Sequence, residues 1–312
     1  MRHSLPRGGI ILLALLAMAP DADYLLRLIS DTFYLQHHRG ITHSILMLPL
    51  WTWLIYSLLP ARRRDYPAMP WLIAAALALH ITLDLITSFG TMIYAPFSDA
   101  RIAWDLVFII DPLFTGILAL PLLCALIWRR RARVFALASL LFMASYTGLA
   151  LIMHHAAVTI VRQEQPAADA VDALPQPFSP FRWQLVASYP DHYSRTVIDL
   201  LPGFPGSGVL FPDSFVRRFS GDIHPSGELQ WQQLPAMRSQ PDIGTLPGVS
   251  FYRWFARFPV LLEKGPDKLV FGDLRFGAGA IADSAFRLEI NLGKVTPKAW
   301  LVWHTGERSA IR

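Results

Sequence analysis

Carboxylate and imidazole side chains recur in the apolar half of this chain, where ionisable groups are usually rare. They fall in short strings between hydrophobic segments, and the residues that carry the pattern are Asp21, Asp23, His38, His43, His80 and Asp84. Inside a bilayer each such group costs about 3 kcal/mol, so its presence requires a reason. Mixed Asp and His ligands suit zinc or another divalent transition metal, and bridging carboxylates suit a two-metal site. The sequence therefore predicts a divalent metal site, with zinc as the expected ion.

His80 and Asp84 lie four positions apart within an apolar segment. On a helix, side chains at this spacing lie one above the other on the same face, about 6 Å apart at Cβ. An imidazole nitrogen and a carboxylate oxygen can then reach one metal. The alternative is a buried His–Asp hydrogen bond that joins two helices, and the pair alone does not decide between them.

The string from His38 to His43 leads directly into a second apolar segment. We expect a helix to begin at Ile41, with Thr42 or Ser44 capping its first turn. His43 would then project from that turn and His38 from the preceding loop, both as ligands. The alternative is a polar loop at the membrane interface with ordinary snorkelling side chains.

Three residues are candidates for catalytic work beside the metal. Arg39 can pair with a carboxylate or hold an anionic substrate such as phosphate. Asp84 or Asp23 can act as the general base if it is not itself a ligand. A bound metal would supply the nucleophile by lowering the pKa of a water molecule.

Other polar groups in this half have simpler explanations. Asp21 and Asp23 follow an apolar segment and, taken alone, are a common polar end to a helix. Asp111 precedes Pro112 and can cap the helix that the proline begins. Asp105 is assigned no definite role. The histidines expected outside the site are His154, His155, His192, His224 and His304.

The composition places the first half of the chain in a membrane. Hydrophobic residues make up 53% and charged residues 16%, whereas soluble domains carry roughly 25% charged residues. A spanning helix needs about 20 apolar residues, which predicts a bundle of four to five transmembrane helices. The expected spans are 41–59, 67–89, 102–128 and 133–161, with a shorter uncleaved segment at 9–20.

Basic clusters give the expected orientation of this bundle. Arg62–Arg64 and Arg129–Arg131 lie in loops between spans, and such loops are normally cytoplasmic. The His and Asp strings then all fall toward the opposite, periplasmic face. Because the clusters are short and loop-bound, we expect contact with the lipid bilayer and no binding to nucleic acid.

The character of the chain changes after residue 161. We expect a transmembrane domain over 1–161, a linker over 162–177 and a small β-rich soluble domain over 178–312 outside the cytoplasm. Apolar residues alternate with period two near Trp183 and near Phe286, which is typical of strands. The single cysteine, Cys124, excludes a disulfide framework.

The strings together resemble the YdjM-like family of bacterial membrane-bound metal-dependent hydrolases. The resemblance covers roughly residues 10–130, and its most specific part is His38-Arg39-Gly40-Ile41-Thr42-His43-Ser44. The other matching parts are Pro20-Asp21-Ala22-Asp23, the His80/Asp84 pair, Gly90, Pro96-Phe97-Ser98 and Asp111-Pro112. It implies a helical fold related to zinc-dependent phospholipase C and S1/P1-type nucleases. It also implies the same metal ligands, Asp21, Asp23, His38, His43, His80 and Asp84, and hydrolysis of phosphate esters.

One departure from the family concerns the N-terminus. Family members open with a helix that supplies a further histidine, whereas this chain begins Met1-Arg2-His3-Ser4. We expect either that the start is truncated or that the site has one ligand fewer.

The expected function is a metal-dependent hydrolase of the bacterial inner membrane, with a metal-activated water attacking an ester; a phosphoester, of a lipid or of another molecule, is the candidate substrate. The alternative is a non-catalytic membrane protein that uses the cluster for structural metal binding, sensing or transport. A third interpretation assigns the work to the β-rich domain, but it leaves the cluster unexplained.

Overall fold

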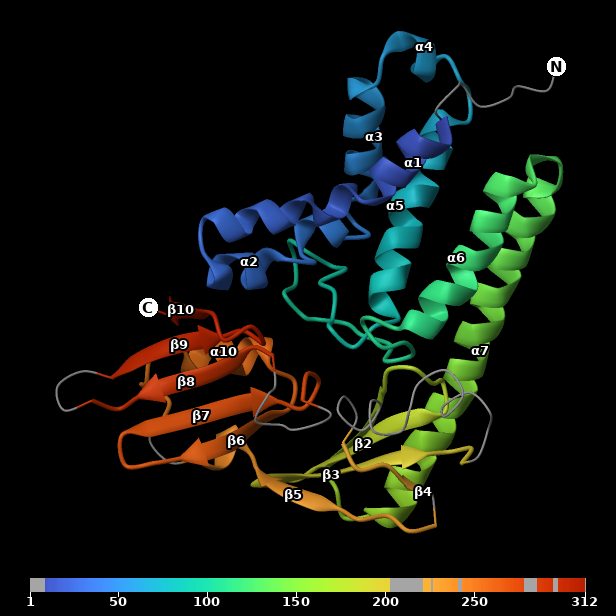
Figure 1. Ribbon diagram of the computed structural model, residues 1–312. Coiled ribbons are helices and arrows are strands. Elements are labelled where there is room, and N and C mark those ends of the chain that lie inside the picture. Colours follow the sequence, from blue (N-terminus) through green and yellow to red (C-terminus); the bar gives the residue numbers. More distant parts are fainter. Residues whose placement is uncertain are drawn as a thin grey trace. The chain divides into compact units, whose positions relative to one another are not determined.

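The computed structural model describes residues 9–202, 221–225, 227–240, 243–277, 285–293 and 297–311 (Figure 1). The chain divides into two compact units, Met1–Trp104 and Asp105–Arg312. His3 and the basic residues near it lie outside the described residues. The expected domain boundary at residue 161, between a transmembrane domain and a linker, stays a prediction.

The first unit is helical. Its elements are α1 (Gly9–Ala17), η1 (Ala19–Leu28), α2 (Asp31–His37), η2 (Ile41–His43), α3 (Leu48–Leu58), α4 (Ala61–Arg64) and α5 (Met69–Leu85). Met69, Ile73 and Leu77 repeat every four residues on α5 and form a buried stripe. Residues of α1 and α3, among them Leu16 and Ile55, pack against this stripe. The stripe holds α5 in place and so fixes the backbone that carries His80 and Asp84.

The second unit begins with a helical hairpin, α6 (Pro112–Ile127) and α7 (Ala132–Glu164), joined through η3 (Arg129–Arg131) (Figure 1). Asp111 is the N-cap of α6, and its carboxylate accepts hydrogen bonds from the backbone N–H groups of Leu113 and Phe114. This confirms the capping role expected from Asp111-Pro112. The second carboxylate oxygen accepts a bond from the hydroxyl of Tyr146 on α7 at 2.7 Å, so the same side chain also ties the two helices together.

The expected number of four to five spanning helices is not confirmed. Among the described residues, only the stretch Arg129–Glu164 is long and apolar enough to cross a bilayer by itself. A second span results if Asp31–His43 and Leu48–Leu58, which meet at 82°, count as one broken segment. α5 and α6 have 17 and 16 residues, which is short of the usual spanning length of about 20.

One boundary prediction inside this region is wrong. No continuous helix runs from Ile41, because Ile41–His43 is a single 3-10 turn and α3 begins only at Leu48. Neither Thr42 nor Ser44 caps a helix. The Ser44 hydroxyl instead donates to the carbonyl oxygens of Ile93 and Ala95, which fastens this turn to the segment after α5.

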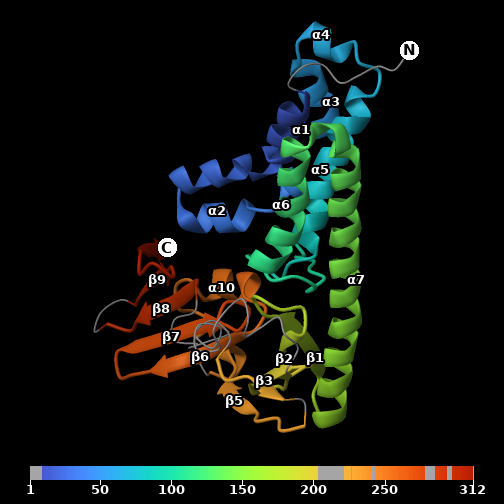
Figure 2. The ribbon, with the colours of Figure 1, turned by 45° about the vertical axis from the view of Figure 1, so that its right-hand side comes forward.

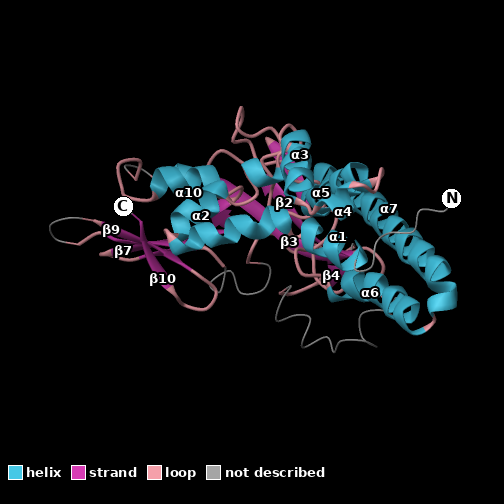
Figure 3. Cartoon of the chain, turned by 90° about the horizontal axis from the view of Figure 1, so that it is seen from above, coloured by secondary structure: helices cyan, strands magenta, loops and turns pink. Residues whose placement is uncertain are grey.

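All named strands lie after residue 169 (Figure 3). The first sheet has the order β1-β2-β3-β4, with β5 also paired to β3, and the second has the order β10-β9-β8-β7-β6. Their bounds are β1 (Ala170–Pro175), β2 (Arg182–Ser188), β3 (His192–Asp199), β4 (His224–Pro225), β5 (Gln232–Pro235), β6 (Pro259–Lys264), β7 (Lys268–Asp273), β8 (Arg287–Asn291), β9 (Lys298–Val302) and β10 (Arg308–Ile311). A short helix, α10 (Val249–Phe255), precedes β6. The expected β-rich C-terminal part is confirmed, although β1 falls in the segment interpreted as a linker.

The end of α7 packs on the first sheet. Ala157 and Val161 of the helix share a buried core with Trp183 and Leu185 of β2, and the helix reaches β1 and β2 in Figure 2. A 33-residue helix is about 50 Å long, which exceeds a hydrocarbon core of about 30 Å. α7 therefore has enough length both to cross a bilayer and to hold the sheet with its last turns.

Candidate metal centre

All six residues expected to bind metal lie in the first unit. They come from η1 (Asp21, Asp23), the residue after α2 (His38), η2 (His43) and α5 (His80, Asp84). The backbone between these elements turns sharply. Gly40 is needed at the turn, because a Cβ there would lie 2.6 Å from the carbonyl oxygen of His37. Arg39 beside it has a φ of 58°, so the chain reverses within two residues and places His38 and His43 near one another.

Three ligand atoms form a compact triangle at the centre of this cluster. Nε2 of His43 lies 3.2 Å from Nε2 of His80. Oδ1 of Asp21 lies 3.5 Å from each of these nitrogens. The His43 side chain is fully buried, whereas the Asp21 side chain is 48% exposed. The triangle thus has a closed side at His43 and an open side at Asp21.

The size of this triangle fits a tetrahedral metal. With ligand distances of about 2.0–2.1 Å and tetrahedral angles, two zinc ligands lie about 3.3–3.4 Å apart. The three observed separations are 3.2, 3.5 and 3.5 Å. No large movement of these side chains is therefore needed to hold an ion.

The hydroxyl of Thr42 sets the tautomer of His43. Its single O–H donates a hydrogen bond to Oδ2 of Asp23, at an oxygen–oxygen distance of 2.9 Å. Its oxygen lies 2.9 Å from Nδ1 of His43, so Nδ1 must carry the hydrogen of that bond. In the neutral ring the other nitrogen, Nε2, then holds a lone pair that faces His80 and Asp21. This is the form of imidazole that binds metals.

Asp84 lies against the same nitrogen atoms. Its Oδ2 is 3.1 Å from Nε2 of His43 and 3.6 Å from Nε2 of His80. This oxygen is buried and makes no hydrogen bond of acceptable geometry. A carboxylate oxygen and an imidazole lone pair at this distance repel one another unless a cation, either a proton or a metal ion, lies between them.

Arg39 holds the other side of Asp84. Its Nη2 lies 2.9 Å from Oδ1 of Asp84, and its Nη1 donates to the hydroxyl of Thr87. This confirms that Arg39 pairs with a carboxylate, which was one of the two roles expected for it. Because both side chains are largely buried, the ion pair fixes Asp84 so that Oδ2 faces the histidines.

Asp23 and His38 form a tighter contact next to this group. Nδ1 of His38 lies 2.8 Å from Oδ1 of Asp23, and Oδ2 of Asp23 also accepts the backbone N–H of Arg39. Burial raises the pKa of Asp23, but its bonds to His38 and Thr42 outweigh that effect and leave the pKa below its usual value. Asp21, Asp23 and His38 also offer ligand atoms within 4.8 Å of one another. The 2.8 Å separation is that of a hydrogen bond, however, and is shorter than that between two ligands of one tetrahedral ion.

Asp21 is ionised in this setting. Hydrogen bonds from the rings of His43 and then His80, in their protonated forms, hold the pKa of Asp21 well below the usual range, against the opposing effect of partial burial. An ionised, half-exposed carboxylate on an otherwise buried triangle provides a negative charge at the open side. The cluster therefore carries the charge that a divalent cation needs.

The structure places the remaining candidates elsewhere. Asp105 belongs to the second unit, where Oδ2 lies 2.7 Å from Nη1 of Arg257. His154 is also in that unit and packs edge-on against Trp183. His37 is exposed, and its Nδ1 lies 2.9 Å from the carbonyl oxygen of Phe33 on its own helix.

Sequence reasoning missed the supporting role of two threonines. Thr42 was expected to cap a helix, and Thr87 was not considered at all. Each forms a hydrogen bond with a charged residue that is far away in sequence. Thr42 donates to the carboxylate of Asp23, and Thr87 accepts from the guanidinium of Arg39. The only sequence signal for Thr42 was its place between two candidate ligands in the most specific string.

Comparison with known proteins gives a family for the first half of the chain. The family described as YdjM inner membrane protein matches residues 2–157, which include every residue of the cluster. An uncharacterized protein of Bacillus subtilis (strain 168), YfhP, is 33% identical over 109 residues. That match spans 33% of this chain and 32% of YfhP, so the chain matches only about a third of the length of this relative. No solved structure gives a significant match.

Proposed function

This chain belongs to the YdjM inner membrane protein family, and from that premise we propose that it is a membrane-bound, metal-dependent hydrolase. The metal would be held by Asp21, His43, His80 and Asp84. The observation that carries the proposal is the group of imidazole and carboxylate atoms at 3.1–3.6 Å around His43 and His80. Two neutral donors and two carboxylates form a ligand set that suits zinc.

The bound ion would lower the pKa of a coordinated water and polarise the scissile ester. The protein's own groups have separate tasks. Thr42 and Asp23 hold the ring of His43 with its lone pair inward. Arg39 holds Asp84 so that its free oxygen faces the site. Asp21 leaves one side of the cluster open to solvent, and this is the side from which a substrate can approach.

We propose a phosphoester as the substrate, with a lipid-linked phosphate as the natural candidate. The support is chemical. A dication flanked by histidines stabilises charge on phosphoryl oxygens, and the family is one of membrane proteins. Arg39 is already bonded to Asp84 and Thr87, so we assign it to positioning Asp84 and assign phosphate binding to the metal.

Metal analysis of the purified protein tests the proposal. Wild type should carry stoichiometric zinc, and His43→Ala and His80→Ala should lose it. The matched control is His37→Ala, because His37 is an exposed imidazole bonded only to its own helix. Full metal retention in both site variants, or loss in all three, contradicts the assignment.

Hydrolysis is tested in the same preparations with bis(p-nitrophenyl) phosphate and p-nitrophenyl phosphate. We expect turnover by the zinc-loaded wild type, its removal by a chelator and its return with added zinc. Asp84→Asn separates two roles for that residue: loss of metal identifies a ligand, whereas retained metal without turnover identifies the proton acceptor. Stoichiometric metal with no turnover of any phosphoester supports structural binding, sensing or transport instead.

A further inference from the structure

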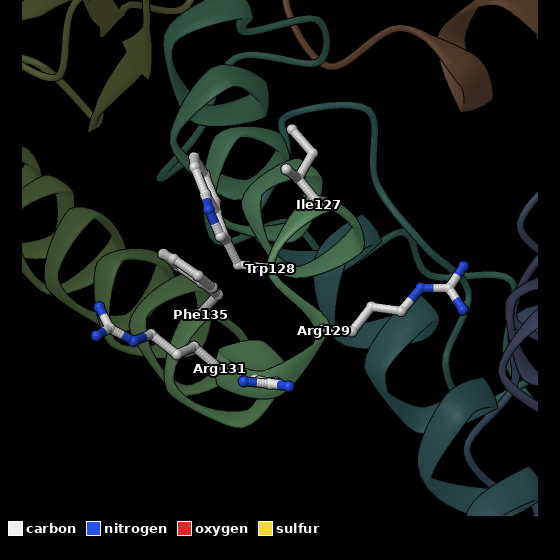
Figure 4. A pocket seen from close by; sticks show the side chains of 6 residues that line it. Ile127, Trp128, Arg129, Arg131 and Phe135 are labelled. Carbon is white, nitrogen blue, oxygen red and sulfur yellow. The ribbon is translucent and has the colours of Figure 1, made fainter.

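The turn between α6 and α7 forms a hollow of about 820 Å³ far along the chain from the metal ligands. It is lined by Ile127, Trp128, Arg129, Arg130, Arg131 and Phe135. Figure 4 shows the rings of Trp128 and Phe135 beside one another, with Arg129 extending to the other side of the turn. The two ring centroids lie 5.9 Å apart. The hollow therefore combines an aromatic wall with cationic groups around it.

The cationic groups have no carboxylate partner among the residues that the structure describes. Arg129, Arg130 and Arg131 are all exposed, and no carboxylate of the described residues forms an ion pair with any of them. Three neighbouring positive charges repel one another, so an external anion is favoured here. Planar guanidinium groups match the geometry of phosphate oxygens.

The surroundings of this turn are apolar on both helices. Apart from Arg133, which is also exposed, the exposed large side chains next to it on α6 and α7 include Leu122, Leu123, Leu126, Ile127, Val134, Leu137, Leu140 and Leu141. Trp128 itself is 55% exposed, and tryptophan is enriched where a bilayer meets water. A ligand that fits both the basic turn and the apolar helix faces needs an anionic phosphate head and hydrocarbon chains. An anionic phospholipid has both.

We propose that the Trp128–Phe135 turn is a binding site for the headgroup of an anionic phospholipid. The phosphate binds at this basic turn, and the acyl chains follow the apolar faces of α6 and α7. A basic turn joining two apolar helices is a setting in which anionic headgroups bind. The site does not depend on the proposed hydrolase, because none of its residues belongs to the metal cluster.

The test compares two lipids that share their acyl chains and differ in headgroup charge. Delipidated protein in neutral detergent is titrated with phosphatidylglycerol or phosphatidylcholine, and bound lipid is counted by native mass spectrometry. The variant Arg129→Gln/Arg130→Gln/Arg131→Gln removes the site. The matched control Arg62→Gln/Arg63→Gln/Arg64→Gln removes the same charge from α4. Circular dichroism and thermal unfolding of both variants verify that they are folded.

We expect wild type to prefer phosphatidylglycerol, and the Arg129–Arg131 variant to lose that preference by about tenfold or more while the control keeps it. Equal binding of the two lipids by wild type overturns the proposal. Equal losses in the two variants also overturn it, because they show a general effect of charge. Glycerol 3-phosphate is added as a competitor that has the phosphate but no acyl chains. If it displaces the lipid at equal concentration, the site binds free phosphate and the lipid assignment is overturned.

Discussion

Replacing Thr42 with valine should weaken zinc binding by about tenfold, even though Thr42 is not a ligand in the proposed site. Valine keeps the branched shape of threonine but has no hydroxyl. The hydrogen on Nδ1 of His43 then loses its acceptor at 2.9 Å. In a neutral ring that hydrogen can move to Nε2, and this nitrogen could no longer bind the metal.

The magnitude follows from the nearest substitute acceptor. Oδ2 of Asp23 lies 3.5 Å from Nδ1 of His43, which is about 0.6 Å beyond the lost bond, so a small rotation of the ring recovers part of the interaction. Loss of an outer partner of a metal-bound histidine costs about 10–100-fold in affinity. Because Asp23 can partly replace the hydroxyl, we place Thr42→Val at the lower end, about 1.4 kcal/mol.

The assay is competition for zinc against a chromophoric chelator, with wild type, Thr42→Val and Thr42→Ser side by side. The serine variant keeps the hydroxyl and should bind zinc nearly as well as wild type. The reasoning is refuted if folded Thr42→Val binds zinc as tightly as wild type. It is also refuted if the serine and valine variants lose affinity equally, since the hydroxyl, which serine keeps, would then not account for the loss.

Three further predictions concern the scaffold and are tested by thermal unfolding in detergent. Asp111→Ala should lower stability by about 1 kcal/mol or more through the lost cap, whereas Asp111→Asn keeps an acceptor and should lose less; equal losses would exclude the cap. Gly90→Ala should destabilise the fold, because Gly90 has a φ of +91° and a Cβ there would lie 2.9 Å from the Cβ of Arg101. The matched control Gly116→Ala, where a Cβ meets open space, should stabilise the fold by about 1 kcal/mol. The opposite order of stabilities would contradict these conformations. Trp183→Ala should cost about 3–5 kcal/mol and make the sheet sensitive to protease, yet leave metal content intact because the cluster lies in the other unit.

The proximity of His80 and Asp84 could be predicted from local sequence, because their spacing fixes their relation on any helix. The structure brings the two side chains to 3.6 Å. The convergence of the other strings followed from placing each at the same end of an apolar segment.

The features that could not be predicted depend on contacts between distant residues. Ser44 bonds to carbonyl groups about fifty positions away, and this contact, which no local pattern contains, accompanies the start of the helix at Leu48 in place of Ile41. The pairing of Arg39 with Asp84 joins residues 45 positions apart. For the same reason, sequence reasoning offered two partners for Arg39 but had no means of selecting one.

The geometry around Asp23 bears on how many metal ions the cluster can hold. A second ion between Asp23 and His38 would have to replace the 2.8 Å bond between them and separate the two atoms by about 0.5 Å, to the spacing of tetrahedral ligands. It would also compete for the carboxylate that receives the proton of Thr42, and so weaken the restraint on His43. Binding a second ion would therefore disturb the site of the first, which favours one tightly held ion with Asp23 as its support.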